Sequence, residues 1–384
     1  MSLKLTLQGC TMPFNSHFVK AVFMSAMMAA TLPSTAASYQ VTTITDALEQ
    51  PWSVAELPGN GGYLVTEKAG RLLQVNNSGV ATTILGTPEV YFKSQGGLLD
   101  VVLDPEFAGN QILYLSYAGG DAETNRTTVV RAKLSAEVLT NQEIILEVEP
   151  NKKKAAHFGG KLAFLPDGTL LLSVGEGFEY REQAQSLDSE LGKLLRINTD
   201  GSAPADNPFP DIAPRVFSYG HRNPQGLVVD PVEGTIWMAE HGPKGGDELN
   251  RIVPGTNYGW PAITYGLDYS GAIISPYTEA EGMAQPVLYW VPSIATSGLA
   301  IYRGTAFPDW NGSLLTGALV DQKLYRLTPT EDSFLQSEPF PEVTGRVRDV
   351  RVLRDGSIAV LTDEGTFFRI TPEPSDATKT ASIE

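Results

Sequence analysis

Cysteine is nearly absent from this sequence, and that absence excludes several kinds of protein. The only cysteine among the 384 residues is Cys10, close to the N-terminus. The remainder of the chain therefore has no disulfide framework, no thiol nucleophile and no cysteine-ligated metal site. Any chemistry that it performs must use other side chains.

Positive charge is also scarce. The chain has 28 Lys and Arg residues against 44 Asp and Glu residues, which gives a formal net charge of −16 at pH 7. A strongly acidic protein repels nucleic acid and anionic membranes, so neither is expected as a partner. In such a chain, a local cluster of arginines stands out as a candidate anion-binding site.

Long hydrophobic runs are missing except near the N-terminus. Lys4 and Lys20 precede an apolar stretch at 21–30, which the small residues of 34–37 follow. This order is typical of a cleaved export signal, with Met12 as an alternative start. We therefore expect a signal peptide at 1–37 and a periplasmic or secreted protein. No other segment is long and apolar enough for a membrane helix, so membrane insertion is not expected.

Helical periodicity is lacking after the signal, except for a short helix that 183–195 could form. Instead, one unit recurs six times: an apolar strand, a turn with Asp, Pro, Asn or Gly, and a second apolar strand. An Asp-Gly turn between apolar runs is a strong hairpin signal. The expected strand pairs are 54–57 with 63–66, 99–103 with 112–116, 162–165 with 170–174, 227–230 with 235–239, 299–302 with 313–317, and 350–353 with 358–361.

These six units predict an all-β fold, a six-bladed β-propeller over residues 38–374. Each unit has room for about four short strands, the size of one propeller blade. A β-sandwich or a pair of barrels is the alternative, but the even number and regular spacing of the units favour the propeller. We expect residues 375–384 to form a polar C-terminal tail.

Histidine is rare enough to be informative. Outside the predicted signal the three histidines are His157, His221 and His241, and each lies in a segment rich in Gly or Pro. Loops at one end of a propeller converge on its central axis, so the three side chains could meet there. The alternative is that each only satisfies the backbone of its own turn.

Three arginines could form a cationic pocket. The planar guanidinium of Arg222 suits a carboxylate. Arg346 and Arg348 alternate along an extended segment, so both side chains point the same way. Together they would suit a ligand with several carboxylates or phosphates, although a solvated strand edge shows the same alternation. No phosphate-binding glycine loop occurs in the sequence.

The segment 240–250 resembles a loop for a hard cation. It contains three glycines, several acidic side chains and free carbonyl groups. Calcium takes about six to eight oxygen ligands, often carbonyls and carboxylates together. The spacing is not that of an EF-hand, and a tight polar turn would have the same composition.

At these positions the sequence resembles the soluble glucose/sorbosone dehydrogenase family, in particular the bacterial aldose sugar dehydrogenases that use pyrroloquinoline quinone (PQQ). The resemblance extends from Pro51 to about Thr371. Its most specific segments are QGGLL at 95–99, HFGG at 157–160, GHRNPQG at 220–226, GPKGGDE at 242–248, NYGWP at 257–261 and RVRD at 346–349.

The resemblance implies roles for individual residues. His157 is the expected general base, which takes the proton of the sugar's anomeric hydroxyl. The backbone carbonyls of Gly242 and Pro243 are expected to hold a PQQ-bound calcium, and Glu248 and Tyr258 a further, structural calcium. The expected cofactor contacts are Gln95, Arg222, Asn223, Arg346 and Arg348, with the acidic Asp247 near the active centre.

One position departs from the family pattern. The family usually has a Lys that contacts PQQ in the loop after the second strand of the fifth unit, where this chain has Val320. Lys323, three residues later, could replace it. The departure puts cofactor affinity in question, and it leaves the fold prediction unchanged.

The implied activity is oxidation of the C1 hydroxyl of an aldose sugar to a lactone, with hydride transfer to PQQ. Electrons would pass on to an acceptor such as a quinone, a cytochrome or a dye; the sequence leaves the preferred sugar, this acceptor and the oligomeric state open. The alternatives are a calcium-dependent six-bladed propeller hydrolase, such as a sugar lactonase, and a non-catalytic carbohydrate-binding propeller.

Overall fold

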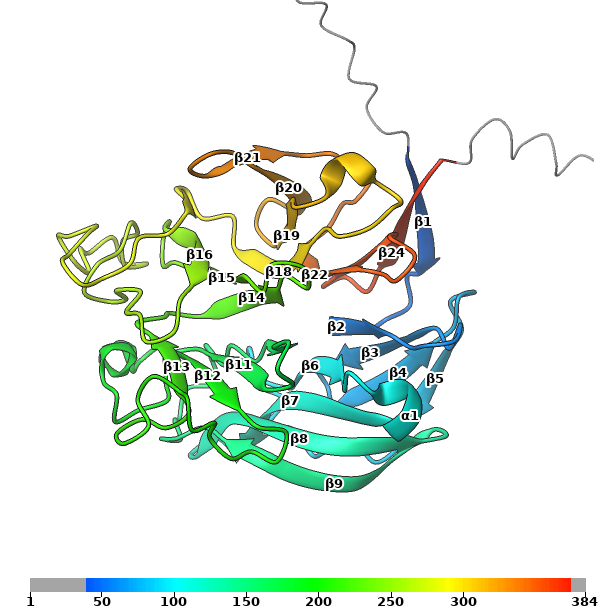
Figure 1. Ribbon diagram of the computed structural model, residues 1–384, viewed down its shortest axis with the longest axis horizontal. Helices are drawn as coiled ribbons and strands as arrows, with labels where there is room; N and C mark the ends of the chain where they lie inside the picture. Colours follow the sequence, from blue (N-terminus) through cyan, green and yellow to red (C-terminus); the bar gives the residue numbers. More distant parts are fainter. Residues whose placement is uncertain (1–38, 374–384) are drawn as a thin grey trace, which may run out of the picture. The chain divides into compact units, whose positions relative to one another are not determined.

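Six four-stranded antiparallel sheets form a ring from residues 39–373, the part of the chain that the computed structural model describes (Figure 1). The predicted six-bladed β-propeller is confirmed. The predicted signal peptide and C-terminal tail lie outside the described residues. Within 39–373, no helix combines the length and hydrophobicity needed to span a bilayer.

Five blades follow one another along the chain. The first contains β2 (Pro51–Glu56), β3 (Tyr63–Glu67), β4 (Arg71–Val75) and β5 (Ala81–Ile84). The second contains β6 (Leu98–Leu103), β7 (Ile112–Gly120), β8 (Asn125–Ser135) and β9 (Val138–Glu147). The third contains β10 (Leu162–Phe164), β11 (Leu170–Val174), β12 (Lys193–Ile197) and β13 (Val216–Tyr219). The fourth contains β14 (Pro224–Val229), β15 (Ile236–Glu240), β16 (Asp247–Ile252) and β17 (Leu288–Trp290). The fifth contains β18 (Thr296–Ile301), β19 (Leu314–Ala318), β20 (Lys323–Pro329) and β21 (Phe334–Ser337).

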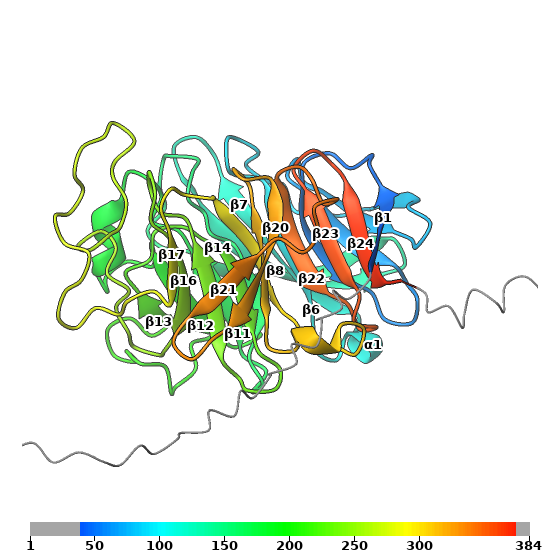
Figure 2. The same ribbon diagram turned by 90° about the horizontal axis from the view of Figure 1, so that it is seen from above.

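The sixth blade joins the two ends of the described chain. It contains β22 (Val347–Val352), β23 (Ile358–Thr362), β24 (Phe367–Pro372) and, as its outer strand, β1 (Tyr39–Thr45). β1 pairs antiparallel with β24, and the four strands run side by side in Figure 2. This pairing closes the ring without a free gap between the first and last blades.

The predicted strand pairs are confirmed as the first two strands of each blade. The predicted helix at 183–195 is wrong. A short 3₁₀ turn covers Arg181–Gln185, and the apolar end of the segment continues as β12. The buried side chains of β12 pack against the neighbouring strands, so tertiary packing decides the conformation there. The other short helices are α1 (Phe107–Asn110) and the 3₁₀ turn Pro308–Trp310.

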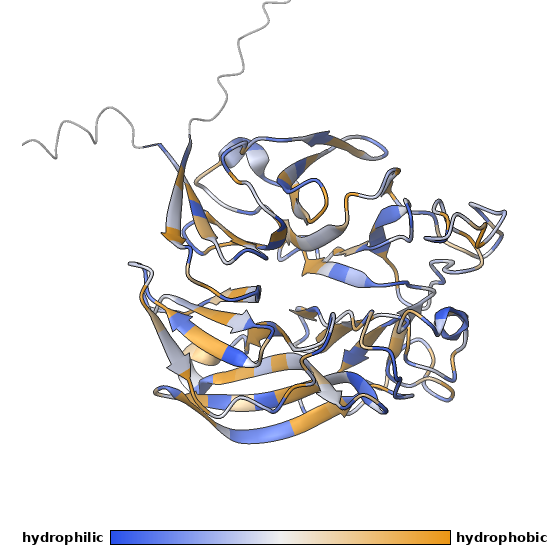
Figure 3. Ribbon diagram, turned by 180° about the vertical axis from the view of Figure 1, so that it is seen from behind, coloured by the Kyte–Doolittle hydropathy of each residue, from blue (hydrophilic) through white to orange (hydrophobic). Residues whose placement is uncertain are grey.

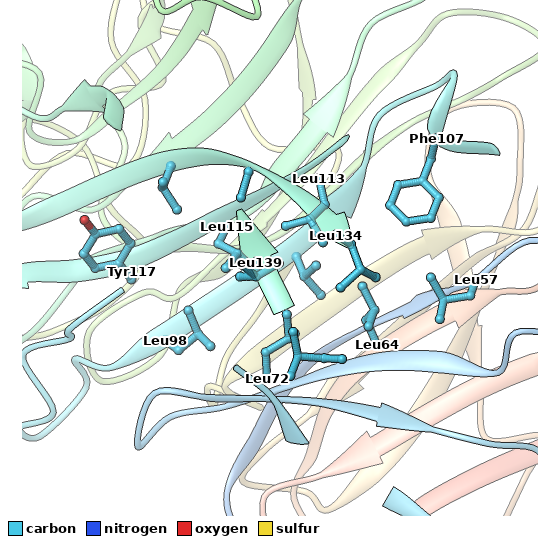
Figure 4. Close-up of a cluster of buried hydrophobic side chains, with 14 residues drawn as sticks. Leu57, Leu64, Leu72, Leu98, Phe107, Leu113, Leu115, Tyr117, Leu134 and Leu139 are labelled. Atoms are coloured by element: carbon cyan, nitrogen blue, oxygen red, sulfur yellow. The ribbon is translucent and has the colours of Figure 1, made fainter. Parts of the chain in front are cut away.

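Apolar side chains fill the space between neighbouring blades. Figure 4 shows one such cluster, where Leu64 and Leu72 of the first blade meet Leu98, Leu113 and Leu115 of the second. In Figure 3, hydrophobic and hydrophilic residues alternate along the strands of the second blade, as expected for sheets that bury side chains against a neighbour. Blade-on-blade packing therefore holds the ring together.

A buried ionic network links the inner strands. Lys161, just before β10, lies 2.8 Å from Asp349 Oδ1 of β22, and Arg351 of β22 reaches Asp100 of β6 at 2.9 Å. Asp349 also pairs with Arg351 at 3.1 Å. The Lys161 ammonium lies 4.3 Å from the centre of the Trp52 ring. The network thus fixes the relative positions of three blades around the axis.

The strand pairing gathers loops from every blade at one face. In the register, the start of a blade's first strand lies opposite the end of its second strand: Pro51 faces Glu67, Pro224 faces Glu240, and Val347 faces Thr362. β14, β18 and β22 lie toward the middle of the ring in Figure 1. Segments that precede a first strand or follow a second strand therefore meet around the axis at this face.

Candidate active site

Three adjoining cavities open at this face. The cationic cavity, about 270 Å³, is lined by polar residues that include Lys68, Gln95, Asn223, Arg346 and Arg348. The aromatic cavity, about 170 Å³, is lined by Glu176, Phe178, Arg222, Trp260 and Tyr269 among others. The apolar cavity, about 540 Å³, contains Gly242, Pro243, Val291 and Val320. His241 borders the cationic and apolar cavities, and Pro243 borders the apolar and aromatic ones.

His157 lies where the first two cavities approach each other. Its neighbours Phe158 and Gly159 line the cationic cavity, and Glu176 and Phe178, which it contacts, line the aromatic cavity. Its backbone has φ +49°, in a region that side chains rarely adopt. Such a backbone persists only where the surroundings impose it, which favours a functional role for this position.

Glu176 orients the His157 ring. Its Oε1 lies 2.9 Å from His157 Nδ1, and both side chains are almost fully buried. An ionised carboxylate can only accept, so Nδ1 carries the proton and Nε2 keeps its lone pair. Within residues 39–373, Nε2 has no hydrogen-bond partner. The imidazole is therefore arranged to accept a proton at Nε2.

The surroundings set the basicity of this imidazole. Burial, the largest effect, lowers the pKa of His157 below its ordinary value, and the Arg222 and Lys152 cations lower it further. The carboxylate of Glu176 acts in the opposite direction. The net lowering keeps the ring neutral near pH 7, the form that a general base requires.

The cationic cavity has an excess of positive charge. Asp363 accepts from Arg348 at 2.7 and 3.0 Å and from Arg346 at 3.0 Å. Although burial opposes it, these arginines lower the pKa of Asp363, which therefore stays ionised. Lys68 adds a third cation, so three positive charges face one negative charge. The cavity can therefore bind a ligand with several carboxylates.

Gln95 is placed by a tight glycine turn. Its Oε1 accepts from the backbone N–H of His157 at 2.7 Å. Gly97 has φ +136°, and a Cβ there would lie 2.1 Å from the carbonyl oxygen of Lys68. Only glycine allows this approach, which holds the turn carrying Gln95 against the turn carrying Lys68.

Arg222 and Asn223 lie in different cavities. Asn223 lines the cationic cavity with Arg346 and Arg348, whereas Arg222 lines the aromatic cavity. Arg222 Nη1 donates to the carbonyls of His241 at 3.0 Å and Gly242 at 2.6 Å. Arg222 therefore lines the aromatic cavity and not the cationic cavity of Arg346 and Arg348.

The three loop histidines differ in their relation to the cavities: His241 lines two of them, and His157 lies beside residues that line them. His241 borders the cationic cavity, its buried Nε2 has no hydrogen-bond partner among residues 39–373, and burial lowers its pKa to about 4. His221 instead bonds through both ring nitrogens, to Ser218 at 2.8 Å and Glu240 at 3.0 Å, and stacks on Tyr258. Its contacts are those of a residue that holds its loop in shape.

The loop expected to bind calcium is anchored by Asp247. This carboxylate is fully buried and accepts from the N–H of Gly242 at 2.9 Å and from Ser293 Oγ. It lines none of the three cavities, but its bond to the Gly242 N–H holds the turn whose residues Gly242 and Pro243 line the apolar cavity. A positioning role accounts for its geometry.

Glu248 and Tyr258, the residues expected at a second calcium, both lie near Glu240. Glu248 and Glu240 each accept from Asn250 Nδ2 at 3.1 Å. Burial and the neighbouring Glu240 raise the pKa of Glu248 to about 8. Across residues 39–373, no group of three or more His, Cys, Asp or Glu side chains could hold a metal.

Neither Val320, at the position of the family's lysine, nor Lys323, its expected replacement, lines the cationic cavity. Val320 is 60% exposed and lines the apolar cavity. Lys323 pairs with Glu338 at 2.8 Å.

Two residues of the site were not predicted from the sequence. Lys68 and Glu176 lie in short turns directly after β3 and β11, in segments without a distinctive motif. Their position in the repeat could have identified them, because a charged residue that follows the second strand of a propeller blade lies at the face where the loops meet.

Residues 48–369 match the protein family described as Glucose / Sorbosone dehydrogenase. The chain belongs to this family. The resemblance that the motifs indicated is thereby confirmed, and the glucose/sorbosone dehydrogenase match includes strands of all six blades.

Relatives within the glucose/sorbosone dehydrogenase family resemble the chain over most of its length. Aldose sugar dehydrogenase YliI from Escherichia coli (strain K12) is 39% identical over 349 residues, 88% of this chain and 94% of its own. Quinoprotein glucose dehydrogenase B from Acinetobacter calcoaceticus is 29% identical over 402 residues, 82% and 84% of the two chains. The PQQ-bound aldose sugar dehydrogenase of Streptomyces coelicolor has a TM-score of 0.72 at 28% identity, covering 87% and 98%.

Proposed function

We propose that this chain is a PQQ- and calcium-dependent aldose dehydrogenase that oxidises the C1 hydroxyl of a sugar to a lactone. The observation that carries the proposal is the His157–Glu176 pair beside a cavity with net positive charge. Family membership supports it, since relatives are named as an aldose sugar dehydrogenase and a quinoprotein glucose dehydrogenase.

The residues of the cationic cavity fit PQQ, which carries three carboxylates. Arg346, Arg348 and Lys68 would hold them, because guanidinium and ammonium groups form charge-assisted hydrogen bonds to carboxylates. The buried Nε2 of His241, which has no partner in the described part of the chain, and the amide of Asn223 offer further hydrogen bonds at the cavity wall.

Calcium would be held by the carbonyl oxygens of Gly242 and Pro243, which line the apolar cavity next to His241, the residue that also borders the cationic cavity. The Gly242 carbonyl accepts one hydrogen bond, from Arg222, and a carbonyl oxygen has a second lone pair for a cation. Oxygen is the donor that calcium prefers. A structural calcium at Glu248 and Tyr258 belongs to the same proposal.

The proton and the electrons of the sugar leave separately. His157 Nε2 takes the proton of the C1 hydroxyl, while the C1–H bond breaks and its electron pair leaves as hydride. The C1–O bond thereby becomes the lactone carbonyl. When bound, PQQ supplies the two-electron acceptor for that hydride. Glu176 stabilises the imidazolium that forms, because its carboxylate is already bonded to Nδ1.

The electrons must then pass to an external acceptor, such as a quinone, a cytochrome or an added dye. An export signal at 1–37 would place this reaction in the periplasm or outside the cell.

Dye-linked oxidation tests the proposal. Protein supplied with PQQ and Ca²⁺ is expected to reduce a redox dye when an aldose is added, and to stop when PQQ is omitted or Ca²⁺ is chelated. A parallel assay for lactone hydrolysis covers the hydrolase alternative. Lactone hydrolysis without dye reduction would replace the dehydrogenase with that alternative.

A further inference from the structure

One buried cation near the proposed base has no carboxylate partner. Lys152 is 2% exposed, and its ammonium donates to Asn125 Oδ1 at 2.9 Å and to the Lys154 carbonyl at 2.7 Å. No carboxylate of residues 39–373 forms an ion pair with it, whereas the next residue, Lys153, pairs with Glu123 at the surface. Lysine is almost never fully buried unless it is paired with a charge, so this ammonium is unusual.

The Lys152 side chain lies between the two turns that carry the His157–Glu176 pair. Its Nζ is 3.3 Å from the centre of the Phe158 ring, and Phe158 directly follows His157. Gly177 directly follows Glu176, and a Cβ on Gly177 would lie 2.7 Å from Lys152 Cδ. The lysine stem therefore packs against the turn of Glu176, while its ammonium packs against the ring beside His157.

Strand β8 fixes Lys152 from another side. Asn125, the first residue of β8, exchanges two backbone hydrogen bonds of 2.8 Å with Lys152. The side-chain amide nitrogen of Asn125 donates to the carbonyls of Asp121 at 3.1 Å and Lys153 at 2.8 Å. Its oxygen is thereby directed at the ammonium. The position of Lys152 relative to the two turns is therefore set by β8.

The ammonium acts on His157 through its charge. Burial, the largest effect, lowers the pKa of Lys152 to about 7, and the carboxylate of Glu176 opposes this lowering. At pH values below 7 Lys152 is therefore mostly a cation, and it lowers the pKa of His157 in the same direction as burial and Arg222. Two cations in a buried region repel each other with little screening by water. Lys152 therefore disfavours the imidazolium form of His157.

The other charged groups around His157 belong to the cavity walls. Glu176 and Arg222 line the aromatic cavity, and they act on the His157 pKa in opposite directions. His241 borders the cationic cavity and is neutral near pH 7, because burial lowers its pKa to about 4. Lys152 lines none of the three cavities, so its effect on the base can be separated from ligand binding.

We propose that Lys152 is a positioning residue of the active site, whose buried ammonium holds the turns of His157 and Glu176 against β8 and opposes protonation of the His157 ring. The proton that Nε2 takes from the C1 hydroxyl then passes readily to water, and the base is free for the next turnover. This inference rests on the proposed function, and it adds a residue that sets the lower pH limit of activity.

Two neutral variants test Lys152, with a matched control. Lys152→Gln removes the charge and keeps a donor for Asn125 Oδ1, and Lys152→Met removes the charge and keeps an unbranched stem against Phe158. Lys153→Gln is the control, because it removes the same charge one residue away, from a side chain that is 70% exposed.

The first measurement needs neither PQQ nor sugar. Protein with isotopically labelled histidine is titrated with acid and followed by NMR, and the His157 signal is the one missing from His157→Gln. We expect the midpoint of His157 protonation to move to higher pH in both Lys152 variants, because a repelling charge has been removed. The Lys153→Gln midpoint is expected to equal that of the wild type.

The second measurement is the pH profile of kcat/KM with PQQ and Ca²⁺ supplied. At the acidic pH where the wild-type value is half of its maximum, we expect a roughly fivefold lower value in Lys152→Gln than in Lys153→Gln. PQQ affinity is expected to stay at the wild-type value, since Lys152 lines no cavity.

An unchanged midpoint of His157 in both Lys152 variants would overturn the inference, as would an equal shift in Lys153→Gln. A uniform loss of kcat/KM at every pH would also contradict it, because Lys152 would then serve packing alone. The proposed function fails differently: wild-type protein would oxidise no aldose. The NMR titration involves no turnover, so it still decides whether Lys152 acts on His157 in that case.

Discussion

At the scale of single residues, the backbone of the site is as informative as its side chains. His157 and Phe178, whose rings are in contact, both have positive φ, at +49° and +70°. A non-glycine residue in such a conformation costs roughly 1–3 kcal/mol. The fold tolerates this cost at two touching residues, and both lie where the proposed base meets the aromatic cavity.

The sequence identified the chemical groups of the site better than their arrangement. His157, Gln95, Arg346 and Arg348 lie in segments with distinctive motifs, and the structure brings them to one face. Glu176 and Lys68 could not be recognised, because their proximity to the other residues depends on strand register. Arg222 and Arg348 look equivalent in the sequence, but their loops direct them into different cavities.

The pH dependence of activity tests the Glu176 carboxylate. Burial, Arg222 and Lys152 lower the pKa of His157, and Glu176 raises it. The neutral base is lost as the pH falls through this lowered pKa, so kcat/KM is expected to decline only below about pH 6.5. Glu176→Gln removes the opposing charge and is expected to move this acid limb to lower pH. An unchanged limb would show that Glu176 does not act on His157.

Cofactor titration tests whether Lys68 makes the PQQ contact for which the family uses a lysine at the position of Val320. Lys68 lines the cationic cavity, whereas Lys323 is paired with Glu338. Lys68→Gln is expected to weaken PQQ binding roughly tenfold or more, the effect of one charge-assisted hydrogen bond. Lys323→Gln, the matched control, is expected to leave PQQ affinity unchanged.

The opposite pattern, with the loss confined to Lys323→Gln, would place the replacement lysine on β20 and remove Lys68 from the cofactor contacts.

At the scale of elements, the inner strands depend on their buried charges. Lys161, Asp100, Asp349 and Arg351 are mutually paired where β6, β10 and β22 approach the axis. Although burial opposes it, Arg351 and Lys161 lower the pKa of Asp349. A carboxyl with a lowered folded-state pKa stabilises the fold above its ordinary pKa, and that stability is lost as the pH falls through the lowered value.

Breaking this network is expected to destabilise the fold strongly. Lys161→Met leaves Asp349 without its 2.8 Å partner, and removing one member of a buried pair costs about 3–5 kcal/mol. Urea unfolding at pH 7 measures the change in the free energy of unfolding. Lys323→Gln, which breaks an exposed pair, is the control and should change that free energy by about 1 kcal/mol or less. Equal effects would mean that the network contributes no more than a surface pair.

The elements differ in how far the sequence predicts them. The first two strands of each blade are apolar runs around a short turn, a pattern that depends on local residues only. The outer strands β5, β9 and β21 are partly exposed and carry less of that pattern. The pairing of β1 with β24 joins segments more than 300 residues apart, and no local pattern encodes it.

At the scale of the whole molecule, the propeller explains how a strongly acidic protein holds an anionic ligand. The net charge is −16, yet the loops at one face bring Arg346, Arg348 and Lys68 together against one carboxylate. The ring of blades supplies the rigid frame, and each blade contributes short loops to the same small volume. Function thus depends on the closed ring, since the site takes residues from at least five blades.

The most direct test of the central claim is an anaerobic single turnover. Protein loaded with PQQ and Ca²⁺ is mixed with excess aldose without an external acceptor, and PQQ reduction is followed by absorbance while lactone is quantified. We predict one lactone for each PQQ reduced, and a rate that falls at least about a hundredfold in His157→Ala with PQQ affinity unchanged. Lactone formation without PQQ reduction, or a His157→Ala rate close to that of the wild type, would contradict the account.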